Sequence, residues 1–596
     1  MTDSLSTNNT DTEPDILDQS FLGDERNEGD KAFAHAHPWL QHYEQGVPVS
    51  ITVPNYPLTW LLDYTVQRYP HHTAFIYYGT KITYARFSQL ADRFAGALQQ
   101  LGVKKGDRVA IALPNIPQYP IAFYGTLLAG AIVVQTNPLY TEREMQYQLA
   151  DAGARVLVML DSFYPTVHAI RAHTALEQVI VTSPADFLPP MLHAFYPLSQ
   201  RLAGQPGTHM HRELHKDPTL HVMSALLKAH TYDEAAPVYR PVELSAEDIA
   251  VLQYTGGTTG LSKGAMLTHR NLLANTLQTR FWFTKIRDGE EVMLAVAPFF
   301  HSYGLTACLN VSILLAATIV LLPRFKSKDV LKAISHYHPT LFPGIPTMYQ
   351  AIIHEASRHP NDLKSIKYCI SGAAPLPSKV RTNFEAITHG KLVEGYGLSE
   401  AAPVTHCNPL TNECRDGSIG LPLPSVDAAI MDPETGVPVP VGKLGEIVVK
   451  GPNVMLGYWK REEETRAMFR HGWMRTGDLG RMDADGFFSV VERIKDVIIA
   501  SGFKIFPHEV EEVLLQHPYI SEAAVAGVPD EYRGETVAAF IVLKPEVEDS
   551  AKTRQELINY CQHVLTAYKV PKIVEFRESL PKSLIGKVLR RELHIT

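Results

Sequence analysis

The segment from Tyr254 to Gly264 concentrates residues that are able to bind an anion. It reads Tyr-Thr-Gly-Gly-Thr-Thr-Gly-Leu-Ser-Lys-Gly, with three glycines within five residues. Glycine lets the backbone turn tightly and point several N–H groups at one place. A flexible surface loop is the alternative, but it leaves the lysine and the density of donors unexplained. The segment therefore predicts a polyphosphate-binding loop, whose donors are Thr255, Gly256, Gly257, Thr258, Thr259, Gly260, Ser262 and Lys263.

The order of residues separates this loop from two common nucleotide-binding motifs. A Walker loop ends in Gly-Lys followed by Ser or Thr, whereas here Ser262 precedes Lys263 and Gly264 follows it. The sequence also lacks the H-R-D and D-F-G signatures of protein kinases. We expect the loop to follow a strand at Ile249–Gln253 and to precede a helix at Thr268–Thr276.

The elements around the loop indicate an α/β protein. Between about residues 55 and 490, helical patterns such as Ala85–Leu101 alternate with apolar strands such as Arg108–Leu113 and Arg155–Leu160. This alternation is typical of layered α/β sheets with largely parallel strands. From about 425 to 492, short strands broken by turns indicate a smaller, distorted β unit. The last hundred residues form a compact α+β pattern.

These changes in pattern divide the chain into four segments. Residues 1–35 are acidic and poor in apolar side chains, so we expect a disordered tail there. Residues 36–492 would form a large N-terminal domain that includes the β-rich part. Residues 493–495 would form a hinge, and residues 496–596 would form a small C-terminal domain.

Six further segments occur in an order that one protein family shows. Together with the loop they resemble the signatures of the adenylate-forming superfamily, which includes acyl-CoA synthetases, the adenylation domains of peptide synthetases and firefly luciferase. The resemblance covers about residues 50–596 and is closest to bacterial long-chain fatty acyl-CoA synthetases. Each segment alone is weak evidence, but the ordered set is specific. The segments are Pro298–Gly304, Ser371–Pro377, Glu394–Glu400, Trp473–Gly480, Glu492–Asp496 with Ser501–Phe503, and Pro581–Lys587.

The resemblance implies a site for ATP and Mg²⁺. Thr255 and Glu400 would hold the magnesium ion, because hard cations prefer oxygen ligands and Mg²⁺ is usually shared with phosphate. Glu394 and Ser399 would join the nucleotide site; Ser399 stands where many relatives have threonine. The residues that would bind adenine are Gly372, Ala373, Ala374 and Tyr396, and those that would bind the ribose hydroxyls are Asp478 and Arg493.

The resemblance also assigns residues to the reaction. His301 would lie beside the acyl carboxylate and the α-phosphate, and Lys587 of the small domain would be catalytic, together with Lys263. The small domain is expected to be mobile, with Lys495 as its hinge. Gly502, which has no side chain, would let the pantetheine arm of coenzyme A pass closely. At Glu492, relatives more often have glycine or aspartate, and its effect on the hinge is an open question.

Taken alone, three of these residues have ordinary structural explanations. Asp478 follows a glycine and could shape a turn. His301 could be a core histidine, and Lys587 could belong to an exposed basic helix. The ordered set of motifs favours the functional interpretation of all three.

The reaction that the resemblance implies has two steps. A fatty acid and ATP would form an acyl-adenylate and pyrophosphate, and the acyl group would then pass to coenzyme A with release of AMP. The sequence ends nine residues after Lys587 without a carrier domain, so we expect free coenzyme A as the acceptor. Two alternatives stay open. One is a ligase for medium-chain or aromatic acids, and the other is a catalytically silent protein that binds an acyl group or a nucleotide.

Composition narrows the partners and the compartment. A net charge of -8 argues against a nucleic-acid binder, whose surface would be basic. The five cysteines are scattered without a C-x-x-C pair, which opposes a disulfide framework or a zinc site and indicates the cytoplasm. Polar residues interrupt the apolar stretch Leu305–Leu322, so we expect a buried helix and strand there rather than a membrane span.

A second apolar stretch, Ala185–Tyr196, has two explanations. Its bulky side chains could touch a membrane from which an insoluble acid is drawn, or they could pack on the large domain. The expected partners are a fatty acid, ATP and coenzyme A. Peripheral attachment to a membrane and formation of a homodimer are left open. The bulky residues are Phe187, Leu188, Met191, Leu192, Phe195 and Tyr196.

Overall fold

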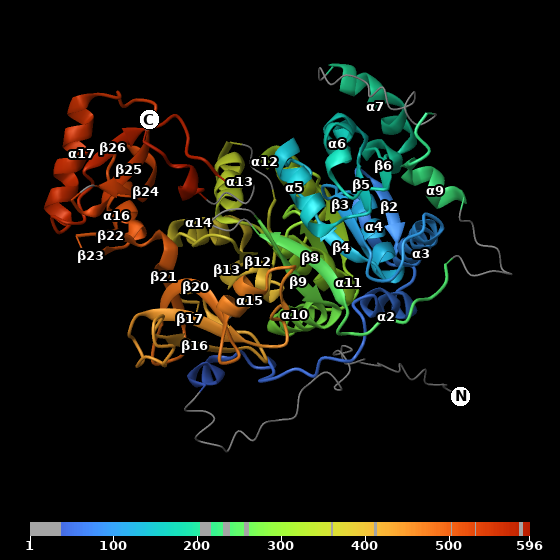
Figure 1. Ribbon diagram of the computed structural model, residues 1–596, viewed down its shortest axis with the longest axis horizontal. Helices are drawn as coiled ribbons and strands as arrows, with labels where there is room; N and C mark the ends of the chain where they lie inside the picture. Colours follow the sequence, from blue (N-terminus) through green and yellow to red (C-terminus); the bar gives the residue numbers. More distant parts are fainter. Residues whose placement is uncertain are drawn as a thin grey trace, which may run out of the picture.

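The computed structural model describes residues 37–202, 216–229, 239–255, 262–358, 362–410, 414–501, 503–530, 532–582 and 588–595. The tail predicted for residues 1–35 lies outside them. A large N-terminal domain of layered α/β sheets is followed by a smaller C-terminal α+β domain. Figure 1 shows the C-terminal domain (red) to one side of the rest, next to strand β21 (Phe488–Arg493).

The largest sheet has eight strands in the order β18-β9-β8-β4-β3-β5-β6-β7. Neighbours from β8 to β7 are parallel, whereas β9 and β18 are antiparallel to their partners. Parallel strands with both faces covered are rich in Val, Ile and Leu, and these strands are largely buried. Their bounds are β3 Arg108–Ala112, β4 Ile132–Gln135, β5 Val156–Leu160, β6 Gln178–Thr182, β7 Leu220–Val222, β8 Ile249–Thr255, β9 Lys263–Thr268 and β18 Gly457–Tyr458.

Two four-stranded sheets, ordered β10-β11-β1-β2 and β12-β13-β14-β15, pack beside it. Isolated bridges link them, from Met293 to Leu341 and from Leu341 to Tyr368. Their bounds are β1 Thr73–Tyr77, β2 Thr80–Thr83, β10 Val292–Ala295, β11 Thr318–Leu321, β12 Tyr368–Ser371, β13 Lys391–Gly397, β14 Val404–Cys407 and β15 Leu421–Pro422.

The β-rich part of the large domain and the C-terminal domain each have one further sheet. The first has the order β16-β17-β20-β19, with β21 also paired to β20, and the second has the order β23-β22-β25-β24, with β26 also paired to β25. The remaining bounds are β16 Asp427–Met431, β17 Gly445–Lys450, β19 Phe469–Arg470, β20 Trp473–Met482, β22 Ile498–Ala500, β23 Phe503–Ile505, β24 Ile520–Asp530, β25 Gly534–Leu543 and β26 Ile573–Phe576.

Helices cover the sheets. The buried helix expected near Leu305 is a π-helix at Gly304–Asn310 followed by α11 (Val311–Leu314). No helix of the described residues is long and apolar enough to cross a membrane. The other bounds are α2 Trp60–Arg68, α3 Tyr84–Gln100, α4 Gln118–Leu128, α5 Glu142–Ala152, α6 Tyr164–Ile170, α7 Pro190–Leu202, α9 Met223–Ala229, α10 His269–Trp282, α12 Ser327–Tyr337, α13 Pro346–Arg358, α14 Ser378–Thr388, α15 Glu462–Met468, α16 Pro507–Leu515 and α17 Ala551–Val564.

The surroundings of the predicted phosphate loop differ from the expectation in one respect. The helix expected at Thr268–Thr276 is α10, which begins at His269, and the Thr268 hydroxyl accepts a hydrogen bond from Asn271 N–H as its cap. Strand β9 lies between the loop and this helix and pairs with β8. The loop therefore connects two strands, β8 and β9, that pair with each other in antiparallel orientation.

Candidate active site

A cavity of about 1620 Å³ lies between the large domain and the C-terminal domain. The predicted site residues that line it are Thr255, Lys263, His301, Gly372, Ala373, Tyr396, Ser399, Glu400, Arg493 and Lys495. Ala374, Glu394 and Asp478 are not among the residues that line it. The remaining predicted residues, Gly256, Gly257, Thr258, Thr259, Gly260, Gly502 and Lys587, lie outside the described part of the chain.

Asp478 binds two residues that line the cavity. Its carboxylate accepts a hydrogen bond from the Tyr396 hydroxyl at 2.6 Å and forms an ion pair with Arg493, whose Nε lies 2.9 Å away. Asp478 and Arg493 are directly opposed across β20 and β21, so the strand register brings this pair together. Asp478 is only 3% exposed. It therefore orients a phenol and a guanidinium at one wall of the cavity.

The segment that begins at Gly372 forms a second wall. A Cβ atom at Gly372 would lie 3.2 Å from Cζ of Tyr303, so glycine permits this close approach. The Tyr303 hydroxyl donates to the carbonyl of Ile370 at 2.6 Å, which holds the ring in place. Behind this wall, Glu394 accepts a hydrogen bond from Leu376 N–H at 2.9 Å. This contact ties β13 to the segment that follows β12, and burial raises the pKa of Glu394 to about 7.

The ends of β8 and β9 form the stem of the phosphate loop. Thr255 pairs with Lys263 at the top of this stem. The Tyr254 hydroxyl donates to Asp151 at 2.7 Å, and Arg461 donates to the same carboxylate at 2.7 Å. Lys263 lies over the ring of Tyr458, with Nζ 5.5 Å from the ring centre. The stem is thus fixed, and its ammonium group faces the cavity.

Glu400 lines the cavity and offers carboxylate oxygens that could bind Mg²⁺. Its Oε1 accepts a hydrogen bond from the Tyr458 hydroxyl at 2.8 Å, which orients the group and leaves Oε2 for another partner. Thr255 lines the same cavity with a hydroxyl group. Beside Glu400, the hydroxyls of Ser399 and Ser302 lie 3.1 Å apart. The oxygen atoms of Glu400 and Thr255 fit the preference of Mg²⁺ for hard ligands.

His301 lines the cavity as a neutral imidazole. Desolvation lowers its pKa to about 4. Its Nδ1 accepts a weak hydrogen bond from Tyr303 N–H at 3.4 Å, so Nε2 carries the proton in the neutral ring. The turn after His301 requires glycine, because a Cβ atom at Gly304 would lie 2.1 Å from the Pro298 carbonyl oxygen. His301 can therefore donate a hydrogen bond to an anion in the cavity.

The C-terminal domain contributes to the cavity on both sides of the predicted catalytic lysine. Lys582 precedes residues 583–587 and Leu589 follows them, and both line the cavity. Lys582 is held by Glu522 at 2.7 Å. The described residues on either side of Lys587 in the sequence therefore reach the cavity wall.

Sequence reasoning did not name many of the residues that line this cavity, among them Glu446, Tyr458 and Arg475. Glu446 accepts hydrogen bonds from Arg475 Nε at 2.8 Å and from Gly477 N–H at 3.0 Å, and it thereby holds the turn before Asp478. Arg475 lies inside Trp473–Gly480, one of the six motif segments. That membership is a signal from which the sequence could have identified it as a site residue. Glu446 and Tyr458 lie in segments without such a signal, and only their contacts show their place.

Comparisons with known sequences match both domains. Residues 62–459 match the AMP-binding enzyme family, and residues 509–587 match the C-terminal domain of AMP-binding enzymes. The chain is 47% identical over 557 residues to a "Long-chain-fatty-acid--CoA ligase" of Bacillus subtilis, which covers 93% of this chain and 97% of the relative. It is 39% identical over 563 residues to a protein of the same name from Escherichia coli, with 93% and 97% covered.

A solved structure has the same architecture. The crystal structure of an ATP-bound RpMatB-BxBclM chimera superposes with a TM-score of 0.77 at 31% sequence identity. The match covers 90% of this chain and 97% of that one. The likeness therefore extends over both domains.

Proposed function

The chain belongs to the AMP-binding enzyme family, and we propose that it joins a long-chain fatty acid to coenzyme A at the expense of ATP. The observation that carries this proposal is a single cavity lined by the stem of the phosphate loop, by Tyr396 and Arg493, and by Lys582 and Leu589 of the C-terminal domain. The names of the two bacterial relatives support a long-chain acid as the substrate.

The chemistry of the first step follows from charge. A carboxylate is ionised near pH 7 and needs no base before it attacks. One of its oxygens attacks the α-phosphorus of ATP, and the bond from that phosphorus to the bridging oxygen breaks, so that pyrophosphate leaves. Two like charges at 4 Å repel by roughly 4 kcal/mol at an effective dielectric constant near 20. Lys263, Lys587 and the Nε2 proton of His301 would offset this repulsion.

Mg²⁺ would bind at Glu400 and Thr255. The free Oε2 of Glu400 and the Thr255 hydroxyl are oxygen donors of the kind that this ion prefers. The ion would neutralise part of the charge of the phosphates. On the other side of the nucleotide, Tyr396 and Arg493, held by Asp478, would bind the ribose, and Gly372 and Ala373 would bind adenine.

The second step transfers the acyl group to a thiol. A thiol with a pKa of about 8.5 is a few per cent ionised at neutral pH, and AMP is a good leaving group. The sulfur attacks the acyl carbonyl carbon, the bond to the phosphate oxygen breaks, and AMP leaves. We propose that the C-terminal domain rotates about Lys495 between the steps, and that Gly502 then lines the path of coenzyme A.

Acid-dependent exchange of labelled pyrophosphate into ATP tests the proposed function. We expect kcat/KM to rise with the length of the acyl chain, by about fourfold per methylene group, because burial of each such group is worth about 0.8 kcal/mol. The panel contains medium-chain, long-chain and aromatic acids. A preference for aromatic acids would exclude the long-chain assignment. Absence of exchange with every acid would leave only a silent binding protein.

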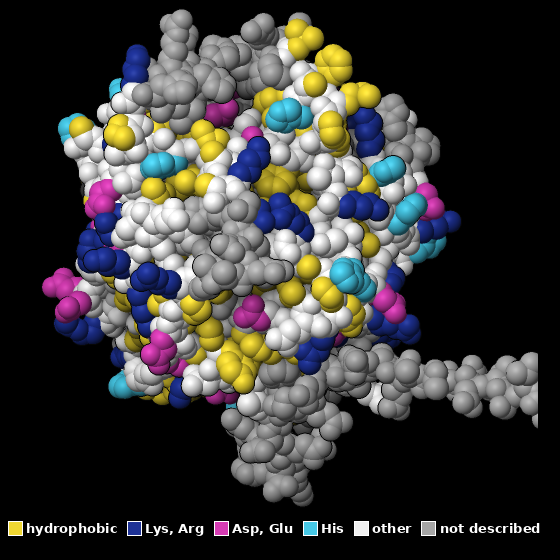
Figure 2. All heavy atoms as spheres, turned by 90° about the vertical axis from the view of Figure 1, so that its right-hand side faces the viewer, with side chains coloured by type: hydrophobic (Ala, Val, Ile, Leu, Met, Phe, Trp, Pro, Cys, Tyr) yellow, Lys and Arg dark blue, Asp and Glu magenta, His cyan; other side chains and the backbone are white. Residues whose placement is uncertain are grey.

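Helix α7 provides a surface through which we propose that the enzyme contacts a membrane. The structure divides the apolar stretch 185–196: Phe187 and Leu188 pack against the main core. Figure 2, which faces the side of the molecule that carries α7, shows hydrophobic side chains gathered on its upper part, with Lys and Arg side chains on the same face. The large hydrophobic residues of α7 that are exposed include Met191 (73%), Leu192 (46%), Phe195 (61%) and Leu198 (54%).

Sedimentation with vesicles of phosphatidylglycerol and phosphatidylcholine tests this surface. We expect the double substitution Met191→Ser and Phe195→Ser to weaken binding at least about tenfold, because it removes apolar area that would enter the interface. The matched control is Val437→Ser with Val441→Ser, which removes two valines exposed by 60% and 56% in the β-rich part. Equal binding of both variants and the parent would contradict a role of α7.

A further inference from the structure

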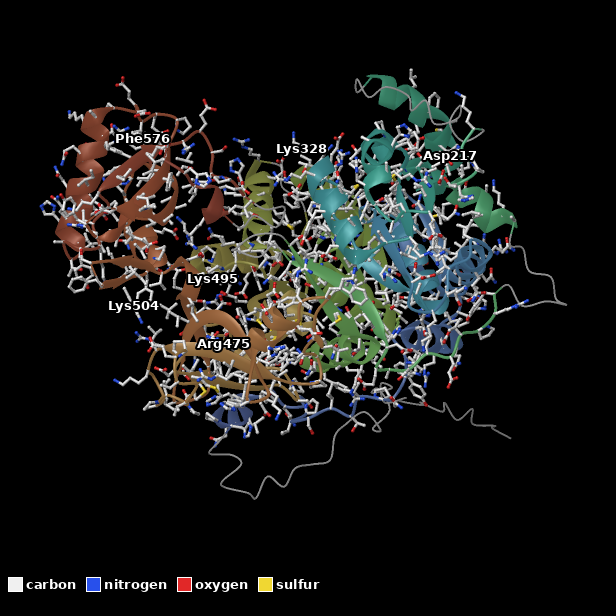
Figure 3. All side chains as sticks on the ribbon, in the orientation of Figure 1. Asp217, Lys328, Arg475, Lys495, Lys504 and Phe576 are labelled. Carbon is white, nitrogen blue, oxygen red and sulfur yellow. The ribbon has the colours of Figure 1, made fainter. Side chains whose placement is uncertain are left out.

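Glu492 is a buried carboxylate at the border between the two domains. It lies in β21 of the large domain, where it pairs with Leu479 of β20, and only 5% of it is exposed. Its Oε1 accepts a hydrogen bond from Arg493 N–H at 3.0 Å, and its Oε2 accepts one from His508 N–H at 2.9 Å. Figure 3 labels Lys495, three residues further, at the junction of the two domains. Glu492 therefore reaches across the hinge.

The contact with His508 completes a helix of the C-terminal domain. His508 lies in the first turn of α16, and the N-cap residue of that helix, Phe506, provides no side-chain cap. The first N–H groups of a helix lack partners within it and favour a negative charge. Glu492 supplies both the acceptor and the charge, and it does so from the other domain.

Arg590 makes a second contact across the hinge. Its guanidinium lies 3.6 Å from Glu492 Oε1, 3.1 Å from Asp496 and 2.9 Å from both carboxylate oxygens of Glu511. Asp496, Glu511 and Arg590 all follow Lys495 in the chain, so rotation about Lys495 can preserve their contacts. The contacts of Glu492 with His508 and Arg590 join the two domains and would break.

The orientation that Glu492 stabilises is the one in which Lys582 and Leu589, on either side of residues 583–587 in the sequence, line the cavity. Arg590 follows Lys587 by three residues, and Leu589, which is adjacent to it, lines the cavity. Burial raises the pKa of Glu492, whereas Arg590 and the N–H groups of His508 and Arg493 lower it, so these partners favour the charged carboxylate. Once the domains rotate, Glu492 loses the α16 N–H group and the guanidinium together. A buried carboxylate without them is unfavourable.

We propose that Glu492 is a positioning residue that holds the C-terminal domain in the orientation for adenylation, and that it thereby sets the balance between the two half-reactions. This inference rests on the proposed function, because it requires a lysine that serves one step and a rotation before the other. The family resemblance alone assigned no role to Glu492.

Two half-reactions of the Glu492→Gln variant test the inference. Glutamine keeps the size of the side chain and one acceptor but loses the charge. We expect pyrophosphate exchange to fall about tenfold, whereas transfer of a supplied acyl-adenylate to coenzyme A stays equal or becomes faster. The matched control is Glu509→Gln, which removes an ion pair with Lys569 inside the C-terminal domain and should leave the ratio of the two rates unchanged. An equal fall of both rates, or no change in either, would overturn the inference.

A structural measurement separates this inference from the function itself. We expect trypsin to cleave after Lys495 several-fold faster in Glu492→Gln than in the parent or in Glu509→Gln, because the domains separate more often. This measurement needs no substrate, so it holds even if no acid supports exchange. Equal cleavage of all three proteins would overturn the inference while leaving the ligase assignment intact.

Discussion

Replacing Lys587 with alanine is expected to reduce formation of the acyl-adenylate by at least about 10²–10³-fold while leaving transfer of a supplied acyl-adenylate to coenzyme A nearly unchanged. Removal of one well-placed donor from a transition state typically has an effect of this size. The developing charge is on the α-phosphoryl group, and the neighbours of the 583–587 segment, Lys582 and Leu589, line the cavity where that group would bind. In the second step negative charge would develop on the carbonyl oxygen of the acyl-adenylate, after the proposed rotation of the C-terminal domain.

The two half-reactions are measured separately. Pyrophosphate exchange reports on the first, and release of AMP from synthetic acyl-adenylate with coenzyme A reports on the second. Lys572→Ala is the control, since Lys572 is an exposed lysine on the same domain. We expect it to leave both rates unchanged. If Lys587→Ala slowed both half-reactions equally, the proposed alternation of the domain would be wrong.

Replacing Asp478 with asparagine is expected to lower kcat/KM for ATP by about 10²–10³-fold, mainly through a higher KM. Asparagine keeps one acceptor oxygen, so either Tyr396 or Arg493 loses its partner. Arg493, whose side chain is 36% exposed, then loses the charge of a partner whose side chain is only 4% exposed. Breaking a buried ion pair by removing one partner typically costs roughly 3–5 kcal/mol. Part of this cost should appear as a lower free energy of unfolding and part as weaker binding of ATP.

Titration with ATP and denaturation by urea distinguish these two effects. The control is Asp485→Asn, which removes an ion pair with Arg415 at 2.7 Å on the same β-rich part, where Asp485 is 49% exposed. Exposed pairs contribute only about 0–1 kcal/mol, so we expect little change in stability and an unchanged KM. Tyr396→Phe should give an intermediate effect on KM. An unchanged KM in Asp478→Asn would show that the cluster does not serve the nucleotide.

Much of the secondary structure could be predicted because its signals are local. The helix expected at Ala85–Leu101 is α3, Tyr84–Gln100, and the strand expected at Arg155–Leu160 is β5, Val156–Leu160. Apolar periodicity lies within these segments, and a capping threonine, Thr83, directly precedes α3. Strand β9 was not expected because its identity depends on pairing with β8, which no pattern inside Lys263–Thr268 reveals.

The stretch Ala185–Tyr196 likewise separates what the sequence shows from what only tertiary contacts decide. The sequence showed that its side chains are apolar but left open what covers them. The structure buries Phe187 and Leu188 against the core and exposes Met191 and Phe195. Which face of a segment meets the core depends on neighbours that are distant in the chain, so burial could not be assigned in advance.

For the phosphate loop predicted at Tyr254–Gly264, the residue types alone indicated the chemistry: glycines for backbone donors, hydroxyl groups and a lysine for an anion. The ordered motifs added the family and the two steps of the reaction. Only the tertiary structure decided which groups meet. Asp478 reaches Tyr396 and Arg493 because the register of β20 and β21 and the path of β13 bring them together. Glu492 acquires a role because α16 and Arg590 arrive from the other domain. Such contacts join residues far apart in sequence, and the free energy of each depends on burial, which only the folded chain creates.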